Sequence, residues 1–307
     1  MESEATARTA FLAGLIDYAG LFPPESRDMA GAVAGYRDAR CLQSWMVHRF
    51  ICPDDRLEEL AGHLEDEPEP WPLAVIVSAP FGEWSKGIAD DARSMAVTQL
   101  ALRDLANFEL AEVRIPPDLV SEPALAAKLA SVRSSLDALF DAVLFEVSLA
   151  GDWAETLPRQ MQAIAEAGAG AKIRCGGAGV EDFPSPEQMA AFISAAVAAG
   201  LRFKATAGLH HPLRHWDSEP GVMRHGFLNV VGAAVLARSL DIDVAEVTEV
   251  VAEVDSQAFE LTDLTFRWRH RAVTVEEIRY GRSAAVLGYG SCSFTEPVAD
   301  LVELGML

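Results

Sequence analysis

Short β-like runs alternate with alanine-rich helical runs along most of the chain, and this alternation constrains the fold more than any other feature. The runs that read as strands are 12–21, 45–51, 73–78, 109–115, 142–148, 170–175, 201–206 and 226–231. Strand–helix–strand units form a parallel sheet with right-handed crossovers. Eight of them predict an α/β fold, a closed (β/α)8 TIM barrel. A doubly wound open sheet is the structural alternative.

The end of the chain falls outside this alternation. We therefore expect a catalytic barrel domain over residues 1–240 and a C-terminal helical extension over residues 241–307, packed on the barrel. The run Ser291-Cys292-Ser293 in this extension indicates a structural turn. The extension is expected to cap the barrel, to cover the mouth of the site or to form a dimer contact, so a homo-oligomer is among the expected assemblies.

The charge balance limits the partners. The chain carries 46 acidic against 25 basic residues, a net charge of −21, which repels nucleic acids and anionic membranes. We expect a small-molecule substrate and neither a nucleic acid nor a membrane as partner. The four cysteines form no C-x-x-C pair and the N-terminus is acidic, which favours a cytoplasmic protein with reduced thiols. Dinucleotide and phosphate-loop fingerprints are absent from the sequence, so no cofactor is expected.

Two lysines lie inside strand-like runs, where lysine is rarely buried without a role. Side chains alternate along a strand, so Lys204 and Thr206 are expected to face the barrel interior, as are Lys172 and Arg174. Two ammonium groups held close together disfavour each other's charge. One lysine is then neutral near pH 7 and can attack a carbonyl group to form a Schiff base.

A second interpretation of the lysines is structural. Both could pair with inward carboxylates and only hold the barrel together; the candidate partners are Asp17, Glu112 and Glu146. Charges concentrated near the carboxyl ends of the strands would still indicate a polar binding site.

Several strand-end motifs occur in an order and at spacings that match a known family over roughly residues 12–240. The motifs are Leu15-Ile-Asp-Tyr-Ala-Gly-Leu-Phe-Pro23, Glu146, Lys172 with Gly176, Phe203-Lys204-Ala-Thr-Ala-Gly208, and His225-Gly-Phe-Leu-Asn-Val-Val-Gly232. They resemble the deoxyribose-phosphate aldolase family, which comprises class I aldolases on a (β/α)8 barrel. The resemblance implies a carbon–carbon lyase in which Lys172 forms the Schiff base and Lys204 depresses its pKa. Asp17 and Glu146 would move protons.

The chain also departs from the family pattern. Arg114 stands where the fourth strand of the family carries a relay aspartate, and Ala207-Gly208-Leu-His210-His211 replaces the phosphate-binding glycine pair. The loss of the phosphate-binding glycine pair of the family therefore predicts a non-phosphorylated substrate. Arg114 and Arg174 are expected to bind a substrate carboxylate, because a guanidinium fork fits one.

Other residues leave alternatives open. His210 and His211 follow the seventh strand and are candidates for substrate binding or proton transfer. With Asp17 they also suggest a metal-dependent TIM-barrel hydrolase, although the resemblance to the aldolases implies no metal. Asn229 is a candidate substrate ligand facing the interior. A non-catalytic small-molecule-binding barrel is the remaining alternative.

Overall fold

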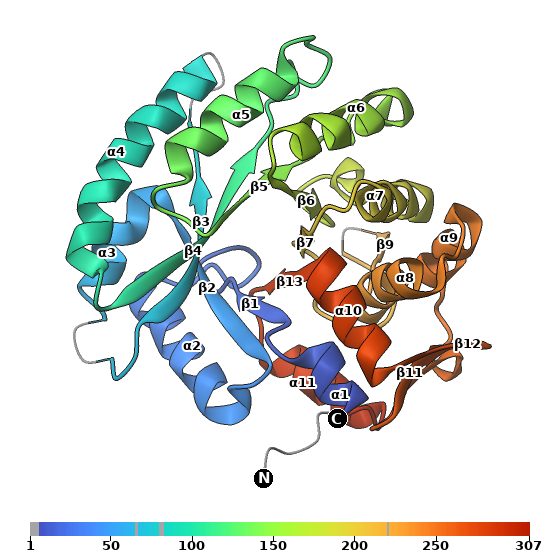
Figure 1. Cartoon of the computed structure of the whole chain (residues 1–307). Coiled ribbons are helices and arrows are strands. Elements are labelled where there is room, and N and C mark those ends of the chain that lie inside the picture. Colours follow the sequence, from blue (N-terminus) through green and yellow to red (C-terminus); the bar gives the residue numbers. More distant parts are fainter. Residues whose placement is uncertain (1–5, 65–66, 80–82, 220) are drawn as a thin grey trace. The chain divides into compact units, whose positions relative to one another are not determined.

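The computed structural model describes residues 6–64, 67–79, 83–219 and 221–307. Eight strands form a closed parallel barrel in the order β1-β13-β7-β6-β5-β4-β3-β2 (Figure 1). The strands are β1 (Ile16–Tyr18), β2 (Val47–Pro53), β3 (Trp71–Val77), β4 (Ala106–Arg114), β5 (Ala142–Glu146), β6 (Gly170–Arg174), β7 (Phe203–Thr206) and β13 (Val286–Ser291). The prediction of a TIM barrel is confirmed.

The predicted eighth strand is wrong. Residues 226–231 belong largely to the helix α8 (Phe227–Leu240), and β13 closes the barrel instead. The chain from Phe227 to Ala237 is buried on every side of α8, so its sequence has no amphipathic period. A continuous apolar run of this kind fits a buried strand or a buried helix equally well. The barrel therefore continues past residue 240, and the predicted domain boundary there is wrong.

The chain divides into two compact units. The first contains the residues up to Ile16, Trp45–Val47 and Ile173–Leu307; the second contains Asp17–Ser44 and His48–Lys172. Among the described residues, no helix has both the length and the apolar character needed to cross a membrane.

Among the described residues, the second unit holds β3 to β5, β2 from its second residue on, and five α-helices. The helices are α2 (Met29–Gln43), α3 (Leu57–Ala61), α4 (Trp84–Leu102), α5 (Leu125–Leu136) and α6 (Trp153–Glu166). Parallel pairing runs without interruption through β2, β3, β4 and β5, with one register shift in β3–β4 between Leu73 and Ala74. An aromatic cluster fills one part of its core, with the rings of Tyr36 and Trp71 4.5 Å apart.

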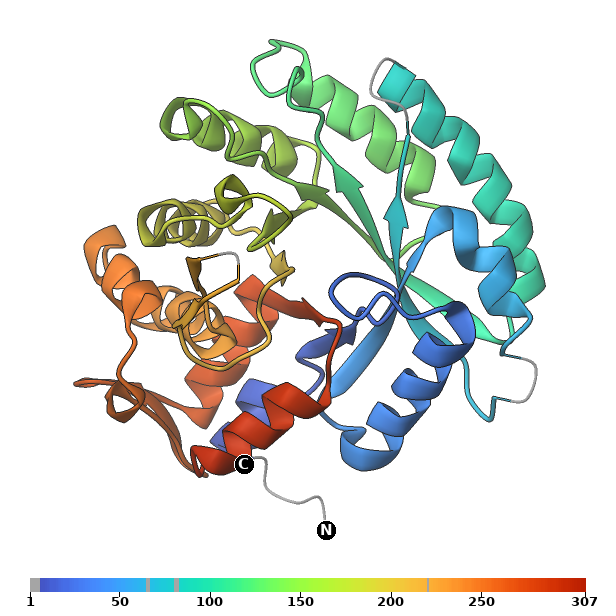
Figure 2. The same ribbon diagram turned by 180° about the vertical axis from the view of Figure 1, so that it is seen from behind.

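The first unit packs several helices around β7 and β13. These are α1 (Ala7–Leu12), α7 (Pro186–Ala198), α8, α9 (Val244–Ala252), α10 (Val275–Ala285) and α11 (Thr295–Glu303). Helix α8 contacts α7, α9 and α10 (Figures 1 and 2). Local sequence fixes the helix starts: Ser185 and Gln188 form a capping box before α7, with Pro186 at its first position. Two short sheets complete the unit, β8 (His215–Asp217) with β9 (Val222–Arg224), and β10 (Phe259–Leu261) with β11 (Thr265–Trp268) and β12 (Arg271–Thr274).

Candidate active site

A lysine lies between two carboxylates in the second unit. The Nζ atom of Lys172 is 2.7 Å from Oε2 of Glu112 and 2.9 Å from Oε2 of Glu146. The three residues come from β6, β4 and β5, and each is at most 5% exposed. We call Lys172, Glu112 and Glu146 the lysine triad. It is a buried polar cluster in the carboxyl-terminal halves of three strands, which is where this fold carries its functional sites.

Strand register and side-chain alternation produce the triad. Glu146 pairs in register with Lys172 on β6 and with Arg114 on β4, so these side chains point to one face of the sheet. Phe145 points the other way, where its ring lies 6.3 Å from that of Trp84 on α4. The helices thus cover the apolar face, and the charged side chains share the opposite face.

The carboxylates decide the charge of the lysine. Burial lowers the pKa of Lys172, but the charges and hydrogen bonds of Glu112 and Glu146 outweigh it and raise this pKa above the ordinary lysine value. The expectation that a neighbouring cation keeps Lys172 neutral is therefore wrong for this structure. Lys172 has instead the carboxylate pairing of the second interpretation.

Arg114 and Asp17 complete the predicted residues of the second unit. The Arg114 side chain is 61% exposed, and its Nε is 3.9 Å from Oε1 of Glu146. The expectation that β4 brings a cation in place of a carboxylate needs correction, because Glu112, two residues earlier, supplies the carboxylate. Asp17 is fully buried, and its Oδ1 accepts a hydrogen bond of 3.1 Å from the backbone N–H of Arg49.

Lys204, Thr206 and Arg174 belong to the first unit. Lys204 is fully buried on β7. Phe203 packs against Phe192 of α7 at 5.1 Å, so Lys204 and Thr206 lie on the face turned away from this helix, as alternation predicts. Arg174 is exposed, and its Nε donates a hydrogen bond of 2.9 Å to the carbonyl of Gly176. The roles of these residues in substrate chemistry, and the pairing of Lys204 with Lys172, stay predictions.

The two adjacent histidines bind carboxylates of α11. Nδ1 of His210 is 3.3 Å from Oε2 of Glu296, and Nδ1 of His211 is 2.6 Å from Oδ2 of Asp300. Within the described ranges, no group of three or more His, Cys, Asp or Glu side chains is arranged to hold a metal ion. The substrate-binding role of the histidines stays a prediction.

Asn229 is not on a strand, which corrects its predicted place facing the barrel interior. It is fully buried on α8, where its Nδ2 donates to the carbonyls of Val250 and Glu253, at 2.9 and 2.8 Å. Its Oδ1 accepts a hydrogen bond from the backbone N–H of Arg214. Asn229 therefore joins α8 to the end of α9, since these three bonds use most of its capacity.

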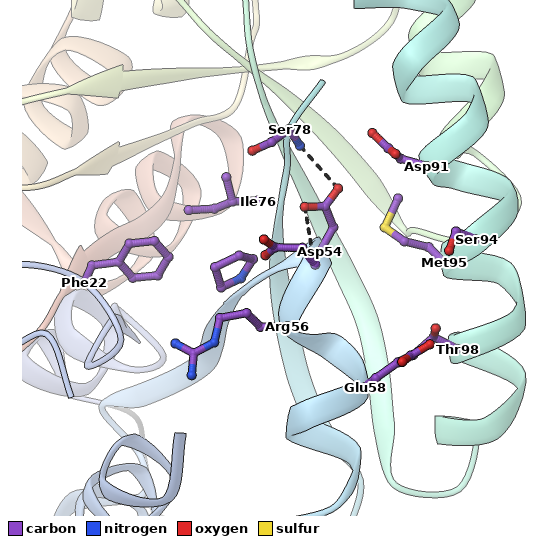
Figure 3. Close-up of a pocket in the computed structure, with 12 residues that line it drawn as sticks. Phe22, Asp54, Arg56, Glu58, Ile76, Ser78, Asp91, Ser94, Met95 and Thr98 are labelled. Atoms are coloured by element: carbon purple, nitrogen blue, oxygen red, sulfur yellow. Dashed lines mark hydrogen bonds between the residues drawn. The ribbon is translucent and has the colours of Figure 1, made fainter. Parts of the chain in front are cut away.

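Sequence reasoning missed a cavity at the carboxyl ends of β2 and β3. Its volume is about 710 Å³, and it lies in the second unit (Figure 3). The lining residues are Phe22, Pro53, Asp54, Asp55, Arg56, Glu58, Ile76, Ser78, Asp91, Ser94, Met95 and Thr98. Its walls come mainly from the carboxyl ends of β2 and β3 and from α4, whereas the lysine triad comes from β4, β5 and β6.

Asp54 lies in the middle of this cavity. Its carboxylate accepts hydrogen bonds from the backbone N–H groups of Ser78, at 3.3 Å, and Asp55, at 3.0 Å (Figure 3). Burial raises the pKa of Asp54 to about 6, and the charge of Asp91 acts in the same direction. The sequence indicated only a helix cap at Asp54-Asp55, because the wall formed by α4 is about 40 residues away along the chain.

Comparison with known proteins supports the fold. No protein-family model and no curated protein matches the chain. A tetrameric deoxyribose-phosphate aldolase from Aeropyrum pernix matches at 13% identity and a TM-score of 0.55, over 96% of this chain and 93% of that one. An aldolase described as QR15 matches at 10% identity and a TM-score of 0.52, over 96% and 97%. The chain thus has a fold like that of the deoxyribose-phosphate aldolases, and at these identities the similarity concerns the fold alone.

Proposed function

We propose that the chain is an aldolase-like carbon–carbon lyase that forms a Schiff base between Lys172 and a small, non-phosphorylated carbonyl compound. The observation that carries the proposal is the position of the Lys172 Nζ, within hydrogen-bond distance of both Glu112 and Glu146. An aldol cleavage through a Schiff base needs an amine that becomes an electron sink and a group beside it that moves protons, for which a carboxylate is suited. The triad contains both.

Proton transfer inside the triad reconciles the charged lysine with a nucleophilic role. If Lys172 passes one proton to Glu112, an ammonium and a carboxylate become a neutral amine and a carboxylic acid. This exchange changes no net charge in a buried site, where isolated charges are costly. Lys172 is therefore protonated in the resting enzyme, and the carbonyl substrate reacts with the small fraction in which Lys172 is a neutral amine.

In the remaining steps the same three residues supply and accept the protons. The amine adds to the carbonyl carbon, and the Glu112 acid protonates the departing hydroxyl as water, which leaves an iminium ion. Glu146 then takes the proton of the substrate's β-hydroxyl while the carbon–carbon bond breaks, and the bonding pair moves into the iminium to form an enamine. Protonation of the enamine carbon and hydrolysis return Lys172 as an ammonium.

An exposed cation beside the triad supports a particular substrate class. The Nε atom of Arg114 is 3.9 Å from Oε1 of Glu146, and its guanidinium group suits a single carboxylate. A small keto acid is therefore the substrate class that we propose, with a simple aldehyde as the uncharged alternative.

A non-catalytic binding barrel is the second candidate function. The raised pKa of Lys172 favours it, because a lysine held firmly as an ammonium can serve as a structural ion pair. In that case the cavity would bind a ligand without forming a covalent bond.

Reductive trapping separates the two functions. The protein is incubated with pyruvate or acetaldehyde and sodium borohydride, and the adduct is mapped by peptide mass spectrometry across the four lysines, Lys86, Lys128, Lys172 and Lys204. We expect the reduced adduct on Lys172, and its loss in Lys172→Met but not in Lys128→Met. Modification confined to Lys86 and Lys128, at the level seen in unfolded protein, would refute the lyase and leave the binding barrel.

A further inference from the structure

A cysteine, a histidine and a glutamate that do not belong to the lysine triad meet in the first unit. The Sγ atom of Cys292 is 3.8 Å from Nε2 and 3.9 Å from Nδ1 of His210. Nδ1 of His210 is also 3.3 Å from Oε2 of Glu296. We call these three residues the cysteine cluster. It has the order of a nucleophilic site: a nucleophile, a base within reach, and a third group that orients the base.

The fold brings these residues together from distant parts of the sequence. β13 and β7 are parallel neighbours in which Gly290 pairs with Thr206, so the segments that leave these strands start side by side. Cys292 follows β13 directly, and His210 lies in the segment after β7. Glu296 is in the first turn of α11, which begins three residues after Cys292. The cluster thus lies at the carboxyl ends of two barrel strands, where this fold carries its functional residues.

The environment suits His210 to accept a proton. Burial lowers the pKa of His210, Glu296 opposes this effect, and Arg224 and His211 lower the pKa further. The imidazole is therefore neutral near pH 7, with a nitrogen able to take the thiol proton. His211 is tied to Asp300, one turn further along α11, so the two carboxylates of this helix hold the two adjacent histidines separately.

We propose that Cys292 is a nucleophilic thiol that His210 deprotonates, with Glu296 as the residue that positions the imidazole. Its substrates are small compounds with an electrophilic carbon that bears a leaving group. His210 accepts the thiol proton while a sulfur electron pair forms the bond to carbon. The leaving group departs with its bonding pair and takes the proton from the imidazolium. This site is independent of the lyase chemistry, because it shares no residue with the lysine triad.

The other cysteines provide internal comparisons. Cys41 is exposed on α2, and Cys52 and Cys175 are buried. Burial raises the pKa of the Cys52 thiol to about 12, which makes it inert near neutral pH. Cys292 is also buried, so burial alone predicts that it stays unreactive, whereas pairing with His210 predicts the opposite.

Iodoacetamide tests the proposal in the intact, folded chain. Peptide mass spectrometry follows the alkylation of all four cysteines in one sample between about pH 6 and pH 9. An ordinary exposed thiol is only a few per cent thiolate at pH 7. We expect Cys292 to react at least about tenfold faster than Cys41 at pH 6.5, with a rate that changes little above this pH. The proposal is overturned if Cys292 is unlabelled, like Cys52, or if its rate rises with pH in parallel with that of Cys41.

Two matched variants separate positioning from general packing. Glu296→Gln removes the carboxylate that orients His210, and Asp300→Asn makes the same change one turn further along α11, at His211. We expect His210→Gln to slow Cys292 alkylation at pH 6.5 by about tenfold or more. Glu296→Gln leaves the imidazole poorly oriented, so the alkylation rate of Cys292 should increase only at higher pH, where the thiol ionises without His210. Asp300→Asn should leave the pH profile in place. Equal profiles for the Glu296 and Asp300 variants would refute the positioning role.

Discussion

Replacing Lys172 with methionine tests the lysine triad through stability. Lys172→Met removes the ammonium and keeps an unbranched apolar chain of similar length. Glu112 and Glu146 then stay buried and lose the ammonium that lies within hydrogen-bond distance of both. Breaking a buried ion pair by removing one partner costs about 3–5 kcal/mol, because the other charge is left uncompensated. We expect a loss of this size in the free energy of unfolding at pH 7.

The pH dependence of this loss follows from the direction of the pKa shift. The folded-state pKa of Lys172 is raised, so its contribution to stability is fully present below the unfolded value of about 10.4 and is lost only as the pH rises through the folded value. In Lys172→Met, two buried carboxylates raise each other's pKa. Protonation then relieves their repulsion, so the variant should recover part of the lost stability between about pH 7 and pH 5.

Urea unfolding followed by tryptophan fluorescence measures both effects. Lys128→Met is the matched control, because Lys128 also pairs with a glutamate, Glu122, but at a half-exposed site beside α5. Exposed pairs of this kind contribute at most about 1 kcal/mol. A Lys172→Met variant no less stable than Lys128→Met at pH 7 would refute the reasoning, as would a stability loss that stays constant down to pH 5.

Three further predictions concern other parts of the chain. Asn229→Leu should lower the free energy of unfolding by about 2–4 kcal/mol in urea titrations, because it leaves buried backbone groups at the end of α9 without partners. Asp54→Asn should be more stable relative to wild type at pH 8 than at pH 4, because the wild type loses stability as Asp54 ionises between its unfolded pKa of about 3.9 and its folded pKa of about 6. Equal differences at both pH values would count against this. Gly288→Ala should cost more stability than Gly151→Ala in thermal melts, because both have positive φ but only the Cβ added at position 288 would come within 2.7 Å of a backbone atom, the Leu15 carbonyl oxygen.

The barrel was predictable because its signal is local. A strand run such as 170–175 carries its own pattern, and the observed β6 (Gly170–Arg174) agrees to within one residue. β13 was not predicted because its local signal is weak. Its sequence, Val-Leu-Gly-Tyr-Gly-Ser, is short and contains two glycines that weaken a strand pattern. Its Gly288 adopts a φ of +145° beside the Leu15 carbonyl, a requirement that only the folded chain reveals.

The candidate site was predictable only in part. Alternation correctly turned Glu146 and Lys172 to one face of the sheet, because it depends on neighbouring residues alone. The charge of Lys172 depends on distances of 2.7 and 2.9 Å across three strands, which no local pattern contains. The same limit applies to His210 and Glu296, which are 86 residues apart in the sequence and meet only in the folded chain.

A crystal structure of the protein after treatment with pyruvate and borohydride would show whether Lys172 forms the Schiff base. We expect electron density that continues from Nζ of Lys172 into the reduced carbon skeleton, with Glu112 and Glu146 still within hydrogen-bond distance of that nitrogen. Bare density at Lys172, with the adduct on another lysine or nowhere in the crystal, would contradict it.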